Sequence, residues 1–348
     1  MNILLTSAGR RSYLVKYFRR ALNGNGQVHV CNSTALSTAF EAADAAVVSP
    51  MIYSDAYIPF LLDYCRQYRI DAVIPLFDPD LPVLSTHRED FGRIGATVIV
   101  SRPEAIAVCN DKWSTYEFLH ANGIDTPRSY LCPDDALSDI GRGALSFPLM
   151  VKPRWGMGSI AVYEVENEEE LRVIYQKVRR EVFRTYLQYE SAADEARCVL
   201  IQEKIAGEEY GLDVVNDLNG CYCATWCKRK WGMRSGETDC AITVDAPDLR
   251  HLGKRLSELL RHVANLDCDV MMKDGRAWVL EMNARFGGGY PFSHVAGANL
   301  PAAILQWLQG QKADEELMHI RYGVAAQKDI TPMSVREDSA MRWKKERE

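Results

Sequence analysis

The first hundred residues alternate short apolar runs with longer stretches in which apolar residues recur every three or four positions. The run "NILLT" (2–6) has the length and composition of a buried strand. The stretch "SYLVKYFRRAL" (12–22) has the spacing of an amphipathic helix. Further apolar runs lie at 28–33, 45–50, 71–77 and 97–101. This alternation of strand and helix predicts a parallel, doubly wound α/β sheet.

From Asn110 onward the pattern changes to a mixture of hairpins and helices. Residues 110–127 have an Asn-Asp start, an Asn-Gly stop and a proline beyond it, which predicts a helix. Residues 148–165 have the pattern of a strand, a glycine-rich loop and a second strand. Further helices are predicted at 167–190, 248–266 and 300–310, and further strands at 198–205, 209–217, 221–230 and in a hairpin over 269–283. The charged tail 335–348 is expected to be exposed.

Composition then narrows the class of protein. With 47% hydrophobic and 25% charged residues among 348, the chain resembles an ordinary soluble protein. A net charge of -6 argues against nucleic-acid binding by bulk electrostatics. No apolar run approaches the roughly 20 residues that span a bilayer. The first residues also lack the pattern of a signal peptide, so we expect a cytoplasmic protein without a membrane partner. The first strand is not followed by G-x-G-x-x-G, which gives a nicotinamide or flavin cofactor little support.

The segment "VLEMNARFGGGYP" (279–291) carries the strongest chemical signal. Glu281, Asn283 and Arg285 alternate along a predicted strand, so their side chains share one face. A carboxylate and an amide oxygen suit Mg²⁺, and an arginine suits an anion. Asp269 begins the partner strand of the hairpin and could complete the metal ligands. The pattern therefore indicates a metal–phosphate substrate, and the alternative is a solvated strand face beside a glycine-rich turn.

Two weaker signals precede this hairpin along the chain. The loop 154–159, "RWGMGS", follows Lys152 and contains Gly156, Gly158 and Ser159. Its backbone N–H groups could cradle phosphates, although it is not a Walker A loop and an ordinary hairpin loop is an alternative. In "QEKIAGEEYGLDV" (202–214), the backbone of Lys204 and Ile205 could bond an adenine edge. Glu209 could accept hydrogen bonds from ribose hydroxyls, with a surface hairpin as the alternative.

The order of these blocks resembles the ATP-grasp superfamily, and most closely its carbamoyl-phosphate-synthase-like ligases with a single grasp unit. The resemblance implies a Rossmann-like pre-ATP-grasp domain at 1–109. An ATP-grasp fold, whose α+β subdomains clamp the nucleotide, would follow at 110–312. Its lid-type subdomain would span about 115–205, and residues 313–348 would form a C-terminal extension.

The resemblance also implies a role for each block. Lys112 and Lys152 correspond to the two nucleotide lysines, and loop 154–159 corresponds to a flexible lid over the phosphates. Glu281 and Asn283 correspond to the Mg²⁺ ligands. The remaining nucleotide ligands would be Glu203 with the backbone of Lys204 and Ile205 at the adenine, and Glu209 at the ribose. Asp269 fits the third metal ligand, with Asp267 as its rival. Arg285 would steady an acyl phosphate, and a basic residue among Lys228, Arg229 and Lys230 would lie near the γ-phosphate.

By the same resemblance, the expected reaction is ATP-dependent ligation of a carboxylate to an amine through an acyl phosphate, with release of ADP and phosphate. The partners would be small molecules, amino acids among the candidates, and a homodimer is left open. The alternatives are another ATP-grasp reaction such as bicarbonate phosphorylation, a nucleotide-binding module without turnover, and a dehydrogenase. Arg10 or Arg11 could hold a substrate carboxylate or belong to a solvated helix start. His294 is expected to be a packed or surface residue.

Overall fold

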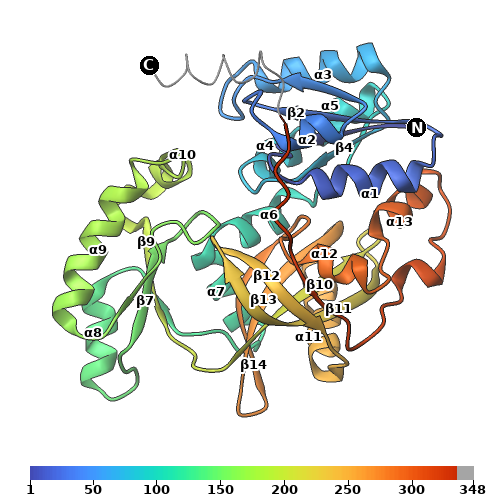
Figure 1. The fold of residues 1–348 in the computed structure, drawn as a ribbon. Coiled ribbons are helices and arrows are strands. Elements are labelled where there is room, and N and C mark those ends of the chain that lie inside the picture. The colour runs from blue at the N-terminus through green and yellow to red at the C-terminus, as the bar shows by residue number, and fades with distance from the viewer. Residues whose placement is uncertain (335–348) are drawn as a thin grey trace.

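The N-terminal part of the computed structural model, which describes residues 1–334, is the predicted parallel sheet (Figure 1). Its strands are β1 (Asn2–Thr6), β2 (Gln27–Asn32), β3 (Ala45–Val48), β4 (Ala72–Pro75) and β5 (Thr97–Val98). They lie in the order β3-β2-β1-β4-β5, and every pairing is parallel. The strand order reverses between β1 and β4, so the loops after these two strands border one crevice, where ligands bind in such sheets.

Helices surround this sheet and connect it to the rest of the chain. The first five are α1 (Ser12–Leu22), α2 (Thr38–Ala42), α3 (Tyr57–Tyr68), α4 (Asp80–Thr86) and α5 (Arg88–Arg93). Two more, α6 (Pro103–Asn110) and α7 (Lys112–Ala121), lead to the second half. Asp111 separates them, and its side chain caps α7 by accepting a hydrogen bond from the backbone N–H of Trp113 at 3.0 Å. This cap fixes the start of the predicted helix at Lys112.

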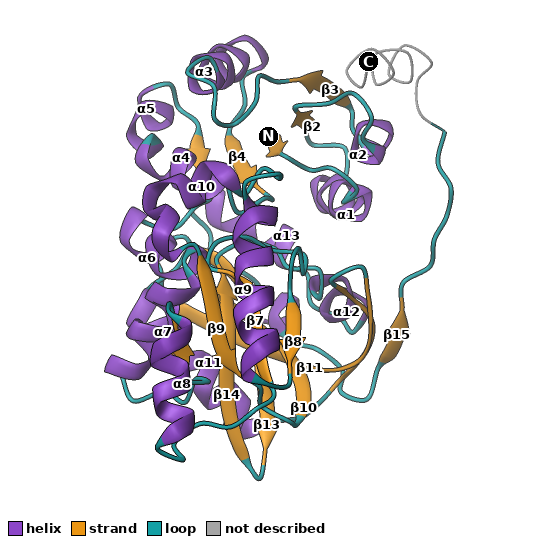
Figure 2. Ribbon diagram, turned by 90° about the vertical axis from the view of Figure 1, so that its left-hand side faces the viewer, coloured by secondary structure: helices purple, strands orange, loops and turns teal. Residues whose placement is uncertain are grey.

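A small antiparallel sheet forms the lobe on the left of Figure 1. Its order is β6-β9-β7-β8, with bounds β6 (Ser129–Tyr130), β7 (Leu149–Pro153), β8 (Tyr163–Val165) and β9 (Val199–Glu203). The helices α8 (Pro133–Gly141) and α9 (Glu168–Val182) lie over it in Figure 2. The buried face of α9 consists of Leu171, Tyr175, Val178 and Val182, which pack on strand residues such as Val151 and Ile201. Their spacing of three and four residues is that of one helix face.

A larger antiparallel sheet forms the second lobe, in the order β14-β13-β10-β11-β12-β15. Its strands are β10 (Glu208–Asn216), β11 (Tyr222–Arg234), β12 (Glu237–Thr243), β13 (Ala264–Lys273), β14 (Arg276–Asn283) and β15 (Ala325–Gln327). The helices of this half are α11 (Pro247–Leu260), α12 (Tyr290–Val295) and α13 (Leu300–Leu308), with the 3-10 turn η2 (Glu315–Met318). Asp274 and Gly275 form the β13–β14 turn with φ of 50° and 74°, the conformation that two-residue hairpins prefer.

The arrangement confirms the predicted fold class, a parallel Rossmann-like sheet followed by two α+β lobes, and corrects several element bounds. The helix predicted at 167–190 ends at Val182, and the short α10 (Gln188–Ser191) and the 3-10 turn η1 (Ala192–Arg197) follow it. The helix predicted at 248–266 ends at Leu260, because Arg261 is left-handed with φ of 48°. Strand β12 was not predicted. The predicted exposed tail 335–348 lies outside the described residues. Among residues 1–334, every helix is too short or too polar to cross a membrane.

Gly253 of α11 lies against Thr225 of β11 and gives a test of this packing. A Cβ at Gly253 would lie 2.4 Å from Thr225 Oγ1 and 3.0 Å from its Cβ, so no rotation of the threonine makes room. Gly253→Ala should therefore lower the free energy of unfolding by about 1–3 kcal/mol, although alanine is the better helix former. Denaturant unfolding measures this.

The matched control is Gly141→Ala at the end of α8, where an added Cβ meets nothing within 4 Å. This change should leave stability unaltered or raise it by up to about 1 kcal/mol. Equal responses of the two variants would contradict the packing of α11 on β11.

Candidate functional site

The β13–β14 hairpin places the predicted metal ligands opposite one another. Asp269 is paired with Glu281, and Asp267 is paired with Asn283. Directly opposed residues on antiparallel strands point to the same face, so all four side chains line one cavity of about 120 Å³. Arg285 lines this cavity too. The alternation that the sequence predicted therefore produces one continuous polar wall, which we call the reaction cavity.

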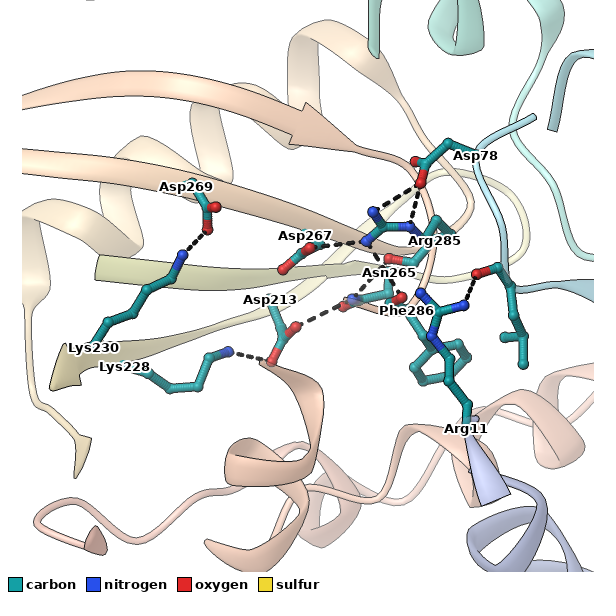
Figure 3. Close-up of polar contacts among 11 residues, drawn as sticks. Arg11, Asp78, Asp213, Lys228, Lys230, Asn265, Asp267, Asp269, Arg285 and Phe286 are labelled. Carbon is teal, nitrogen blue, oxygen red and sulfur yellow. Dashed lines mark hydrogen bonds and ion pairs between the residues drawn. The ribbon is translucent and has the colours of Figure 1, made fainter. Parts of the chain in front are cut away.

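Arg285 is held between two carboxylates from different parts of the chain (Figure 3). Its Nε lies 2.9 Å from Asp78 Oδ2, and its Nη1 lies 2.9 Å from Asp267 Oδ2. Burial alone would lower the pKa of Arg285, but the two carboxylates raise it above its ordinary value. Asp267 is thus occupied by the guanidinium, and this geometry favours Asp269 over Asp267 as the third metal ligand.

Of the three basic residues considered on β11, Lys228, Arg229 and Lys230, only Lys230 lines the reaction cavity. Its Nζ lies 2.6 Å from Asp269 Oδ1 and 2.7 Å from Glu209 Oε1. Burial would lower the pKa of Lys230, but Asp269 and Glu209 raise it above its ordinary value. Lys230 therefore carries a fixed positive charge beside the expected metal ligands.

The structure does not bring Lys228 and Arg229 to that cavity, and this corrects the expectation that they are catalytic. Lys228 is fully buried, where its ammonium group pairs with Asp213 and lies 3.1 Å from Ser293 Oγ. Arg229 points to the opposite face of the sheet and pairs with Glu208 at 3.1 Å. Alternation along a strand separates residue 229 from its two neighbours.

The two predicted nucleotide lysines approach the same region from the other lobe. Lys152 donates to Gln202 Oε1 at 2.8 Å, and Lys112 donates to the carbonyl of Gly156. Burial lowers the pKa of Lys152 to about 8. Burial would raise the pKa of Glu281, but nearby cations led by Lys112 and Lys152 lower it instead, so this carboxylate stays ionised.

The glycine-rich loop lies close to its surroundings on both sides. Gly156 has φ of 114°, and a Cβ there would lie 2.5 Å from a methyl group of Leu187. A Cβ on Gly236 would lie 2.5 Å from the carbonyl oxygen of Gly158, so the β11–β12 turn contacts the loop directly. Ser159 is exposed and left-handed, with φ of 56°. The loop thus covers the reaction cavity, which Met157 and Gly158 line.

The loop is anchored at its base by an ion pair that the sequence did not predict. Arg154 donates to both carboxylate oxygens of Asp111, at 2.8 Å and 2.7 Å. The same carboxylate caps α7, whose first residue is Lys112. Asp111 therefore holds both the base of the loop and Lys112, which donates to the loop carbonyl of Gly156.

The predicted adenine and ribose ligands lie at the ends of β9 and β10. Glu203 ends β9, where its carboxylate lies 3.3 Å from the backbone N–H of Arg128. The ammonium of Lys204 turns to Glu164 at 2.7 Å, which leaves its backbone as the contact expected for adenine. Ile205 is buried, and Glu209 is shared with Lys230. Their roles toward a nucleotide remain predictions.

Beyond Arg285 lies another cavity, of about 310 Å³, at the carboxyl ends of β1 and β2. Arg10 and Arg11 line it, and Arg11 also lines the reaction cavity. The guanidinium of Arg11 bonds the carbonyl of Leu76 and keeps a buried Nε without a hydrogen-bond partner among the described residues. His294 lies elsewhere, stacked on Tyr17 with ring centroids 3.6 Å apart, which agrees with its interpretation as a packed residue.

The fold and the arrangement of these residues define an ATP-grasp protein. The sequence matches the ATP-grasp domain family over residues 109–289 and the family of PylC-like N-terminal domains over residues 3–99. The chain belongs to the ATP-grasp family, as its order of motifs predicted.

Among curated proteins, the chain is similar to the carbamoyl phosphate synthase large chain of Campylobacter jejuni. The two are 24% identical over 291 residues, which cover 76% of this chain and 25% of that protein. The corresponding protein of Deinococcus radiodurans is 25% identical, with 78% of this chain and 26% of that protein covered. This chain thus spans about a quarter of the length of these relatives.

Solved structures share the fold at lower identity. The biotin carboxylase domain of the Hydrogenobacter thermophilus 2-oxoglutarate carboxylase, solved with MgADP, ADP and bicarbonate, has a TM-score of 0.70 and 18% identity, covering 93% of this chain and 73% of that one. An L-amino acid ligase from Bacillus licheniformis has a TM-score of 0.67 and 19% identity, covering 92% and 77%. Proteins with different substrates therefore share this architecture.

The lowered pKa of Lys152 predicts a pH dependence of ATP binding. A phosphate partner favours the charged ammonium, so the pKa of Lys152 rises from about 8 when the nucleotide binds. Binding then takes up a proton above about pH 8, and affinity should fall there by up to roughly tenfold per pH unit. Calorimetric titration with ATP and Mg²⁺ between about pH 7 and about pH 9.5 measures this.

Lys152→Arg is the control, because a guanidinium stays charged throughout this range. Whatever its affinity at neutral pH, the variant should lose little more as the pH rises. An equally steep fall in the variant would exclude Lys152 as the titrating group.

Proposed function

We propose that this protein is an ADP-forming carboxylate–amine ligase that uses ATP and Mg²⁺. The observation that carries the proposal is the reaction cavity, in which Asp269, Glu281 and Asn283 face Lys230 and Arg285. Oxygen ligands on one wall and fixed cations beside them suit a metal–phosphate group next to a second anion. Its membership of the ATP-grasp family supports the same chemistry.

The donor set fits magnesium and a nucleotide. Glu281 stays ionised, and with Asn283 and Asp269 it offers hard oxygen ligands, while phosphate oxygens and water would supply the rest. Lys112 and Lys152 lie close enough to Glu281 to lower its pKa, so they would pair with the phosphates of a nucleotide whose adenine lies at Glu203. When bound, MgATP supplies the phosphoryl group and neutralises part of its charge.

Each residue of the reaction cavity then has a defined task. Arg285, kept rigid by two carboxylates, presents its remaining guanidinium surface to the substrate carboxylate and to the acyl phosphate formed from it. Lys230 faces the transferring phosphoryl group. The glycine-rich loop excludes water, which would otherwise hydrolyse the acyl phosphate. The amine then attacks the carboxyl carbon, and phosphate leaves.

Bicarbonate phosphorylation is the second candidate function. The curated relatives are carbamoyl phosphate synthase chains, and the Hydrogenobacter domain was solved with bicarbonate. Bicarbonate is the smallest carboxylate-like acid, so the same cavity could phosphorylate it. The adjoining cavity of about 310 Å³ favours a larger acid, because bicarbonate would leave that space unused.

A substrate screen tests the proposal directly. The protein is given ATP, Mg²⁺ and individual amino acids or other carboxylic acids, with hydroxylamine as nucleophile. We expect one class of acids to give a hydroxamate together with ADP and phosphate. AMP and pyrophosphate would instead indicate an adenylate, and ADP release with bicarbonate alone would favour the second candidate.

Arg285→Lys should separate nucleotide binding from chemistry. Lysine keeps a positive charge but cannot bond Asp78, Asp267 and the substrate anion in one plane. We expect MgATP affinity within a few-fold of the parent and hydroxamate formation slower by roughly 10²-fold, the scale of one lost transition-state donor.

The melting temperature of Arg285→Lys must be measured alongside, because the guanidinium is buried between two carboxylates. A folded variant with parental turnover would show that Arg285 supports the structure and not the reaction.

A further inference from the structure

A second, much smaller cavity lies under the glycine-rich loop beside the reaction cavity. It has a volume of about 10 Å³, the room that one water-sized group needs. Its walls include Asp78, Asn110, Glu190 and Lys112, and it is bordered by Glu281 and Asn283 of the hairpin. We call it the inner cavity. Its position connects it to the expected site of acyl-phosphate formation.

Two oxygen atoms of the inner-cavity residues are buried without a donor. Asp78 is only 6% exposed, and its Oδ2 accepts both bonds from Arg285. Its Oδ1 has no hydrogen-bond partner among the described residues. Asn110 Nδ2 donates to the carbonyl of Asp78 at 3.0 Å, while Asn110 Oδ1 has no partner within the same part of the chain. A buried acceptor without a donor destabilises the fold, so a donor is expected here.

Glu190 adds a third unsatisfied group from the opposite lobe. Within residues 1–334 its carboxylate forms no ion pair and no hydrogen bond. Burial and the charge of Asp78 together raise the pKa of Glu190 to about 7, while the nearby Lys112 lowers it. The segment around it is fixed by aromatic contacts to the N-terminal sheet, where Tyr189 stacks on Tyr53 with ring centroids 4.1 Å apart. The packing of Tyr189 therefore holds the neighbouring Glu190 at the edge of the inner cavity.

These features specify the occupant. The ammonium of Lys112 also lines the cavity, but it donates to the carbonyl of Gly156. The three acceptors therefore suit a further small cation that donates at least three hydrogen bonds, whereas water donates two and carries no charge. A primary ammonium group has three donors in a compact head. A metal ion fits less well, since no three Asp, Glu, His or Cys side chains of the described residues converge closely enough to hold one.

We propose that Asp78, Asn110 and Glu190 bind the ammonium group of a primary amine, the nucleophile of the ligation. The proposal rests on the proposed function and assigns a chemical class to its second substrate. The inner cavity holds only the ammonium head. Met157 lines this cavity and also the cavity of about 310 Å³ that contains Phe77 and Ile52, so the carbon chain of the amine would extend there.

The same placement brings the nitrogen to the acyl phosphate. Asp78 bonds both the ammonium and Arg285, which holds the acyl phosphate, so the two reactants lie on either side of one carboxylate. One proton first leaves the ammonium, which frees the nitrogen lone pair. The carbon–nitrogen bond then forms, and the carbon–oxygen bond to phosphate breaks with its electron pair going to phosphate. The two protons that nitrogen loses leave with phosphate or pass to solvent, and the atoms and charges balance.

Calorimetric titration of the MgADP-loaded protein with n-butylammonium chloride tests the site. The parent should bind the probe, and Glu190→Gln should bind it about 10-fold more weakly, because one charged acceptor becomes a neutral amide. Glu195→Gln is the matched control, since Glu195 is an exposed acid in the same segment that lines no part of the cavity. It should bind like the parent.

Equal affinity of the parent and Glu190→Gln would overturn the proposal, as would no binding by the parent. If potassium binds with the same dependence on Glu190 and competes with the amine, the inner cavity is an alkali-ion site and the amine proposal is wrong. The melting temperature of Glu190→Gln, which should match the parent's, shows that the variant is folded.

A hydroxamate assay separates this proposal from the proposed function. Hydroxylamine is uncharged at neutral pH, so Glu190→Gln should form hydroxamate within a few-fold of the parent rate. Loss of both hydroxamate formation and MgADP affinity in the variant would place Glu190 in the activation step and contradict the amine site. A parent protein that forms no hydroxamate would refute the proposed function, while the calorimetric result would still decide the ammonium site.

Discussion

The buried ion triad of Asp78, Arg285 and Asp267 is the interaction on which the arrangement of the site depends. Asp78 follows β4 of the parallel sheet, whereas Arg285 and Asp267 belong to the hairpin of the larger lobe, and Arg285 is 207 residues from Asp78 along the chain. An unpaired buried charge costs several kcal/mol, so separating Arg285 from its two carboxylates would strongly destabilise the folded state. The triad therefore fixes the crevice of the first sheet against the polar wall of the reaction cavity.

The first of the glycines after Arg285 follows from the same constraint. A Cβ on Gly287 would lie 2.0 Å from the carboxyl carbon of Asp267, so only glycine lets the chain turn past this acid. A Cβ on Gly288 would meet the side chain of Glu237 at 3.5 Å, an ordinary contact. The first of the two thus serves the ion triad, and the second has no comparable steric requirement.

The sequence predicted the features that depend on local periodicity. Alternation in a strand is enough to place Glu281 and Asn283 on one face, and an Asp-Gly turn is enough to pair that strand with Asp269. Arg285, predicted on the same strand, lies beyond the end of β14 and still lines the same cavity. Alternation also separates Arg229 from Lys228 and Lys230, but it cannot say which face meets the cavity or how far each side chain reaches. That choice is made by Asp213, which holds Lys228 in the core.

Tertiary features could not be read from the chain in this way. The "FDPD" segment (77–80) places Asp78 at a strand end, a position that attracts ligands, but nothing local connects it to Arg285. Glu190 fell within a predicted continuous helix, and it reaches the inner cavity only because α9 ends at Val182 and α10 turns toward the first sheet. The neighbouring Tyr189 stacks on Tyr53, which lies far away along the chain in the N-terminal part.

The charges of the site are balanced by pairs that a metal–phosphate ligand can replace together. Lys230 is held by Asp269 and Glu209, and Glu281 is surrounded by lysine and arginine charges. A magnesium ion bound by Asp269 and Glu281 would occupy one of the two carboxylates that pair with Lys230. The phosphates would then give that lysine a new anionic partner. Metal alone would take the charge of Glu281 away from Lys112 and Lys152, whereas phosphates bound with it would restore a counter-charge to these lysines. From these ion pairs we therefore expect the site to favour the complete metal–nucleotide complex over either component.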